Sequence, residues 1–117
     1  MHPLHTTHNL IVGDCRQVLK TLPSHSVHVV VTSPPYNVGI DYRQWKDNLS
    51  FDEYLDFTRA WIKQCYRVLT DDGRICVNVP LETYRKNSID LFQFHTIMNA
   101  CGFKARALIS CGRRYRN

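Results

Sequence analysis

No apolar run in the sequence approaches the roughly 20 residues that a membrane-spanning helix needs. The chain opens with neither the basic residues nor the apolar core of an export signal. Its five cysteines are odd in number and never form a C-x-x-C pair, which argues against a disulfide framework and a zinc ribbon. We therefore expect a cytoplasmic protein with no membrane contact.

Acidic residues are absent from residues 104–117, which carry five Lys and Arg. Residues 1–103 hold ten residues of each sign, so the whole formal net charge of +5 comes from this basic C-terminal end. Such a segment suits a polyanion such as nucleic acid, and its candidate contacts are Arg113, Arg114 and Arg116. A solvated basic tail without a partner is the alternative.

Apolar runs and turn residues alternate along the chain in a strand and helix rhythm. Four strands are predicted, at residues 9–14, 27–31, 74–79 and 103–110. Three helices are predicted, at residues 15–22, 51–69 and 88–100. The run 27–31 is too apolar for a half-exposed strand, so we expect it to be buried on both faces. This order predicts a single domain over residues 1–117 with an α/β fold and a mainly parallel sheet.

Several helix ends carry recognisable sequence signals. Ser50 with Glu53 three residues later is a capping-box pattern that opens the second helix. The turn residues 71–73 are expected to end that helix, and Gly102 follows the third.

The segment Thr32-Ser33-Pro34-Pro35-Tyr36 follows the predicted strand 27–31, at the strand end where parallel sheets bind ligands. Two consecutive prolines fix φ and have no N–H groups, so the loop offers acceptors in a shape that is set before a ligand arrives. Tyr36 adds a flat face for stacking. These features predict a site for a planar amino group. A tight strand exit, with Tyr36 covering the core, is the alternative.

Four segments resemble the amino-methylating DNA methyltransferases of the permuted class: residues 11–15, 22–27, 32–37 and 67–80. The spelling Ser-Pro-Pro-Tyr is most associated with cytosine-N4 methylation, whereas adenine-N6 enzymes more often have Asp or Asn first. The resemblance implies a partial Rossmann-like methyltransferase fold with helices on both faces of the sheet. It also implies S-adenosylmethionine as cofactor and DNA as partner, in a bacterial or archaeal cell or encoded by a phage.

The resemblance also implies roles for individual residues. Its catalytic segment is Ser33, Pro34, Pro35 and Tyr36, in which the Ser33 hydroxyl and the Pro34 carbonyl accept hydrogen bonds from the amine. Tyr36 would stack on a flipped base, beside Asn37. Asp14 and Thr32 would contact the cofactor, although a turn-forming role for Asp14 is an equal alternative. The reaction needs no metal, so none is expected.

The glycine-rich Phe-x-Gly-x-Gly segment of this family is missing, because the five glycines never occur at G-x-G spacing. In the permuted class that cofactor half lies downstream of the Ser-Pro-Pro-Tyr loop. We therefore expect the N-terminal catalytic portion of a longer enzyme, whose missing strands belong between 9–14 and 27–31. Unpaired strand edges would make the 117-residue chain poorly soluble and inactive alone.

The sequence thus predicts a DNA methyltransferase that acts on the N4 amine of cytosine. Two alternatives concern the substrate, namely the N6 amine of adenine and the amide of a protein glutamine. A third is an inactive remnant that binds nucleic acid without chemistry.

Overall fold

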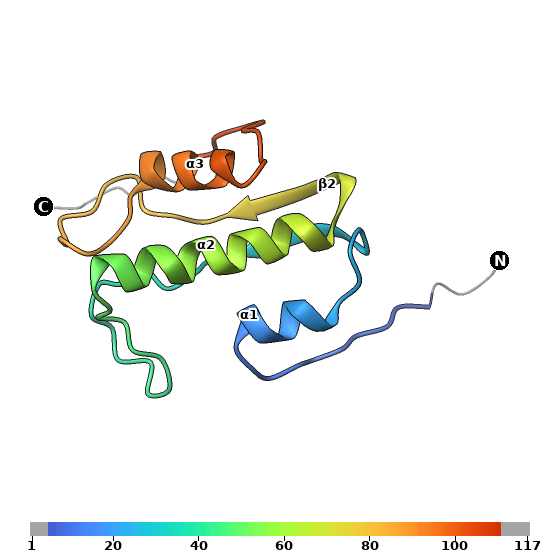
Figure 1. The fold of residues 1–117 in the computed structure, drawn as a ribbon, viewed down its shortest axis with the longest axis horizontal. Helices are drawn as coiled ribbons and strands as arrows, with labels where there is room; N and C mark the ends of the chain where they lie inside the picture. The colour runs from blue at the N-terminus through green and yellow to red at the C-terminus, as the bar shows by residue number, and fades with distance from the viewer. Residues whose placement is uncertain (1–4, 111–117) are drawn as a thin grey trace, which may run out of the picture.

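The structure is a computed structural model that describes residues 5–110. Its elements follow in the order α1 (Cys15–Val18), η1 (Leu19–Thr21), β1 (Val27–Thr32), α2 (Phe51–Val68), β2 (Leu69–Val77) and α3 (Leu91–Ala100). The strands β1 and β2 pair in parallel, with the long helix α2 as the connection between them (Figure 1). The predicted α/β class and the parallel sheet are confirmed.

The helix α2 supplies most of the core because one of its faces is apolar along its whole length. Its buried residues recur at spacings of three and four: Tyr54, Phe57, Thr58, Trp61, Ile62, Cys65 and Val68. As predicted, Ser50 caps the helix, and its hydroxyl accepts the Glu53 N–H at 3.2 Å. Phe94 and Ile97 of α3 complete the same cluster.

The two faces of the β1–β2 pair differ in burial. Val30 and its partner Ile75 pack against the core formed by α2 and α3. Val29 and Val31 point the other way and are 57% and 77% exposed. The expectation that residues 27–31 are buried on both faces is therefore wrong. Among the described residues, helices cover only one face of the β1–β2 pair.

The junction between α2 and β2 differs from the prediction. The helix ends at Val68 and the strand begins at once at Leu69, instead of after residues 71–73. Those three residues lie inside β2, where the register jumps from Val27 opposite Leu69 to Val29 opposite Arg74. The predicted turn is thus a bulge within the strand, and the strand ends at Val77.

Two predicted strands are not formed. Residues 9–14 run as irregular chain, with Leu10 94% and Val12 92% exposed. Residues 103–110 are also irregular, and Ile109 is 86% exposed. A strand needs a neighbour for its backbone groups, and the described residues offer no third strand beside β1 and β2.

The remaining helix predictions hold with shifted starts. The segment 15–22 forms α1 and η1 and ends before Pro23. The last helix begins at Leu91 rather than at residue 88, because Asp90 and Gln93 form the capping box. As expected, Gly102 follows its end, with φ of +109°.

Two long connections meet at the carboxyl end of the strands. Residues 33–50 follow β1 and residues 78–90 follow β2, and both lie beside the beginning of α2 (Figure 1). We call these two segments the loop edge. Within residues 5–110, no helix has both the length and the apolar content for a bilayer span.

Candidate functional site

The Ser-Pro-Pro-Tyr loop is held at the loop edge by hydrogen bonds to its carbonyls. The Tyr54 hydroxyl of α2 donates to the Pro35 carbonyl at 2.5 Å. The Ser88 hydroxyl, from the connection after β2, donates to the Tyr36 carbonyl. The loop is therefore tied to two elements that are distant in sequence, and its shape does not depend on a ligand.

The Tyr36 side chain forms a third tie. Its hydroxyl donates to the Asn78 carbonyl at 2.8 Å and lies 3.0 Å from the Ser33 Oγ. The Tyr36 ring is half-buried, whereas Ser33 is exposed. The phenol thus joins the loop after β1 to the first residue after β2.

Asn37 organises the chain that leaves the loop. It has a left-handed φ of +60° and is 5% exposed. Its Nδ2 donates to the carbonyls of Leu49 and Asn87, at 2.8 and 2.9 Å, and its Oδ1 accepts the Leu49 N–H at 2.7 Å. The side-chain amide is fully used inside the protein, so in this arrangement it offers no group to a nucleic acid.

Asp47 performs a similar function from the other side of the connection. It is 2% exposed, and its carboxylate accepts the backbone N–H groups of Asn37, Val38 and Ile40 at 2.9 to 3.0 Å. A carboxylate that accepts several N–H groups is a strong local organiser. Together with Asn37 it fixes the residues directly after Tyr36.

Two acceptors of the loop keep unused capacity. The carbonyls of Pro35 and Tyr36 are taken, but no hydrogen bond among the described residues uses the Pro34 carbonyl. Over residues 5–110, the Ser33 Oγ has one hydrogen-bond contact, with the Tyr36 hydroxyl. Ser33 is exposed whereas Pro34 is buried, so Ser33 is the acceptor that an incoming group meets first. The arrangement therefore has two oxygen acceptors from neighbouring residues on a loop that Tyr54 and Ser88 hold in place.

The buried phenol that supports the loop stays neutral. Burial, with the Asp47 charge as a smaller cause, raises the pKa of Tyr54 well above its usual value. Its hydroxyl is therefore a reliable donor to the Pro35 carbonyl at neutral pH.

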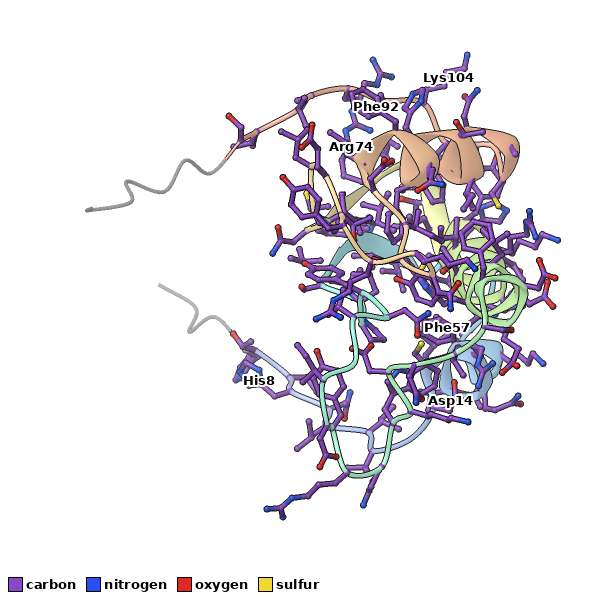
Figure 2. All side chains as sticks on the ribbon, turned by 90° about the vertical axis from the view of Figure 1, so that its left-hand side faces the viewer. His8, Asp14, Phe57, Arg74, Phe92 and Lys104 are labelled. Carbon is purple, nitrogen blue, oxygen red and sulfur yellow. The ribbon has the colours of Figure 1, made fainter. Side chains whose placement is uncertain are left out.

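The two residues expected at the cofactor have partners of their own. Asp14 is the N-cap of α1, and its carboxylate accepts bonds from the Arg16 backbone and guanidinium, the shortest at 2.6 Å. These bonds lower the pKa of Asp14. Arg16 in turn lies over the rings of Trp45 and Phe57. Asp14 and Phe57 are both labelled in Figure 2. The Thr32 carbonyl accepts the N–H of Asn78 at 2.9 Å.

The remaining predicted contacts are not part of this geometry. Arg113, Arg114 and Arg116 lie outside the described residues. Over residues 5–110, no three His, Cys, Asp or Glu side chains gather closely enough to hold a metal ion.

Comparison with known proteins places this loop in a family. The sequence model of the N6- and N4-type DNA methylases matches residues 27–112, from the start of β1 to beyond α3. The chain belongs to this DNA methylase family. The resemblance that the sequence indicates is confirmed.

Curated relatives of the chain are much longer than the chain itself. The type II methyltransferase M.MjaVI of Methanocaldococcus jannaschii is 52% identical over 61 residues, which cover 52% of this chain and 31% of the relative. M.HpaI of Haemophilus parainfluenzae is 43% identical over 68 residues, covering 58% and 22%. The chain thus spans less than a third of these relatives.

A solved structure shares the fold. The putative DNA modification methylase TTHA0409 of Thermus thermophilus, complexed with S-adenosyl-L-methionine, is 28% identical with a TM-score of 0.61. The match covers 84% of this chain and 41% of that structure. The chain therefore has part of the fold of an S-adenosylmethionine-dependent methylase, as predicted.

Four residues that support the site were not predicted from the sequence. Tyr54 and Ser88 carried only helix signals, Asp47 stood in a polar loop, and Asn78 acts through its backbone. An Asp or Asn in a polar connection is only a weak sequence signal for a loop-organising role. The partners of Asn37 and Asp47 become apparent only in the three-dimensional structure.

Proposed function

We propose that this chain carries the base-binding part of a DNA methyltransferase that methylates the exocyclic N4 amine of cytosine. The observation that carries the proposal is the pair of acceptors with unused capacity, Ser33 Oγ and the Pro34 carbonyl, on a loop held by Tyr54 and Ser88. Family membership supports the reaction class. Serine at the first position of the Ser-Pro-Pro-Tyr segment, Ser33, supports cytosine over adenine as the substrate base.

The chemistry explains why acceptors are needed. The lone pair of an exocyclic amine is delocalised into the ring, which makes the nitrogen a poor nucleophile. Two acceptors that bind its hydrogens draw the nitrogen toward a tetrahedral geometry and leave its lone pair pointing away from them. Ser33 and Pro34 would therefore act by positioning and electrostatics, without a covalent enzyme intermediate.

The base must leave the duplex before it can reach this loop. Flipping costs a few kcal/mol, and stacking on an aromatic face returns about 1–3 kcal/mol per base. Tyr36 is the aromatic residue of the loop, so stacking on its ring stays our prediction. For Asn37 we now propose a positioning role instead of direct contact, because its amide is used internally.

The methyl group would come from S-adenosylmethionine, the cofactor named in the solved relative. Within residues 5–110, Arg16 donates to the Asp14 carboxylate, and the Thr32 carbonyl accepts the Asn78 N–H. Contacts of Asp14 and Thr32 with the cofactor stay predictions. We propose that methyl transfer requires the parts of the relatives that this chain does not span, so that the 117-residue chain is inactive alone.

A chimera tests the proposal directly. The matched 61 residues of M.MjaVI are replaced by those of this chain, and the product is incubated with DNA and labelled S-adenosylmethionine. We expect labelled N4-methylcytosine in the hydrolysed DNA. The same chimera with Ser33→Ala is the control, with methylation reduced by about a hundredfold, as for loss of one preorganised catalytic group.

Each other outcome identifies a different function. Label in N6-methyladenine would favour the adenine alternative and refute cytosine. A folded chimera that binds DNA but incorporates no label would refute the enzyme proposal and favour the nucleic-acid-binding remnant.

The basic end provides an independent test of DNA as partner. We propose that Arg113, Arg114 and Arg116 contact phosphates. Replacing all three by Gln should then reduce the slope of log K against log salt by about 3, since each phosphate contact contributes roughly 0.9. Charge-conserving replacement by Lys is the matched control and should leave the slope unchanged. An unchanged slope in the Gln variant would contradict these contacts.

A further inference from the structure

We propose that the Tyr36 hydroxyl fixes Ser33 as an obligate acceptor, so that the loop selects bases with an amino group over bases with an oxo group at the same ring position. This inference deepens the proposed function and rests on it. It assigns to Tyr36 a positioning role that is separate from stacking.

The assignment follows from counting protons. The Tyr36 hydroxyl carries one proton, and a carbonyl carries none, so the 2.8 Å contact with the Asn78 carbonyl uses the Tyr36 proton. The 3.0 Å contact between Ser33 Oγ and the Tyr36 oxygen must then use the Ser33 proton. Ser33 is left with lone pairs only, and an incoming group has to be a donor.

We call the hydrogen-bonded chain from Ser33 through Tyr36 to Asn78 the relay. Hydrogen bonds of the backbone hold Asn78 and Tyr36 in place. The Asn78 N–H donates to the Thr32 carbonyl at 2.9 Å, which holds the peptide beside the acceptor of the Tyr36 proton. At the backbone, the Ser88 hydroxyl donates to the Tyr36 carbonyl. Because the Asn78 carbonyl can only accept, the direction of the two hydroxyl bonds cannot reverse while both contacts are made.

The consequence is discrimination between cytosine and uracil. The N4 amine of cytosine donates hydrogens, whereas the O4 of uracil can only accept. The uracil O4 would then face the Ser33 Oγ with no proton between the two oxygens. Both oxygens would lose their hydrogen bonds to water without gaining one in return. Without the Tyr36 hydroxyl, Ser33 could rotate and donate to O4, so that both bases would be accepted.

The test uses the 117-residue chain and two single-stranded probes. Each probe is an oligothymidine with one central deoxycytidine or one central deoxyuridine, so that the two probes differ only at the central base, in the group at C4 and in the proton at N3. Fluorescence anisotropy gives the two dissociation constants. For the unmodified chain we expect about a tenfold preference for the cytosine probe, which corresponds to roughly one unmade hydrogen bond.

Three variants separate the relay from loop stability. Tyr36→Phe keeps the ring but removes the relay, and the preference should fall to about twofold or less. Ser33→Ala removes the acceptor and should lose the preference while Tyr36 stays bound to Asn78. Ser88→Ala unties the Tyr36 carbonyl but leaves both hydroxyl contacts, so it should retain the preference. Circular dichroism checks the folding of each variant. If Tyr36→Phe does not fold, the result for Ser33→Ala decides whether the relay controls the preference.

The outcomes distinguish this inference from the proposed function. A cytosine preference that survives in Tyr36→Phe, or in Ser33→Ala, would overturn the relay and leave the proposed function standing. No preference in the unmodified chain would overturn the relay and the proposed recognition of an amine together. Loss of the preference in Ser88→Ala would show that loop stability, not proton direction, controls selection, and would also overturn the relay.

Discussion

Two regions of the β1–β2 pair differ. The loops at its carboxyl end form an internally hydrogen-bonded polar network, whereas one face of the pair exposes apolar side chains. At the loop edge, the buried Asn37 and Asp47 use their side-chain oxygens and nitrogens within the protein. On the opposite face of the sheet from α2, Val29 and Val31 are more than half exposed. Within residues 5–110, the Ser-Pro-Pro-Tyr loop thus has its supporting contacts, whereas one face of the sheet that carries it stays uncovered.

The difference agrees with the lengths of the relatives. The chain spans between 16% and 31% of three of the curated relatives that it matches. A loop whose ties all come from residues 33–90 can keep its shape without the remainder, whereas a sheet face is buried only by further elements. Four variants test the loop edge and the open face, with the largest expected effect first.

Replacing Asp47 by Asn should cause the largest loss of stability at the loop edge. An amide has one acceptor oxygen in place of two, so its NH2 group must face either the N–H of Asn37 or those of Val38 and Ile40, and at least one N–H is left without an acceptor. We expect the free energy of unfolding to fall by about 3 kcal/mol, measured by urea denaturation with circular dichroism. The control Glu82→Gln changes an exposed acid of the same edge and should have little effect. A loss below about 1 kcal/mol would contradict the organising role of Asp47.

Val30 and Val31 form a matched pair that tests the two faces of β1. Val30→Ser should reduce the free energy of unfolding by roughly 2 kcal/mol, because Val30 packs against the core. Val31→Ser should change it by less than about 0.5 kcal/mol, because the side chain is 77% exposed. Equal losses in the two variants would show that both faces of this strand are buried in the isolated chain.

Tyr54→Phe should cost about 1 kcal/mol at pH 7, because the Pro35 carbonyl loses its donor. Its pH dependence has a defined sign. The pKa of Tyr54 is raised in the folded chain, so the phenol ionises more readily when the chain is unfolded, with a pKa of about 10. The Tyr54 contribution is complete below pH 10 and is lost above it. The stability difference between the unmodified chain and Tyr54→Phe should therefore narrow above pH 10, and a constant difference would argue against a buried phenol.

Val31→Lys should have the smallest effect on folding stability. It should nevertheless change solubility clearly. A charge at an exposed strand position discourages association through the open face. Solubility, measured by sedimentation at increasing concentration, should rise while the urea midpoint stays the same. The matched change Lys20→Val on exposed η1 should not improve solubility. An aggregation threshold unchanged by Val31→Lys would refute the open face as the source of association.

Local signals in the sequence were sufficient for the parts of the fold that local chemistry determines. Ser50 with Glu53 gave the start of α2, and the apolar spacing of three and four gave its buried face. These features depend on neighbours within a few residues, so their physical cause is present in the sequence itself. The acceptor site expected from the prolines of the loop stays a prediction.

Features that depend on distant partners were predicted less well. Residues 9–14 have the composition of a strand but are exposed, because no strand lies beside them in the described chain. The turn at residues 71–73 became a bulge because β2 pairs with β1 on both sides of it. The ties of Tyr54 and Ser88 to the loop join residues 19 and 52 positions apart, and no local pattern indicates them.

The central claim is that Ser33 and the Pro34 carbonyl hold the amine of an extruded cytosine. NMR with a DNA probe carrying one cytosine labelled with 15N at N4 tests it most directly. The account predicts that binding shifts the labelled amino protons and produces nuclear Overhauser contacts from them to the Ser33 side chain. A labelled amine that keeps its free-DNA shifts in the bound complex, with no contact to Ser33, would contradict it.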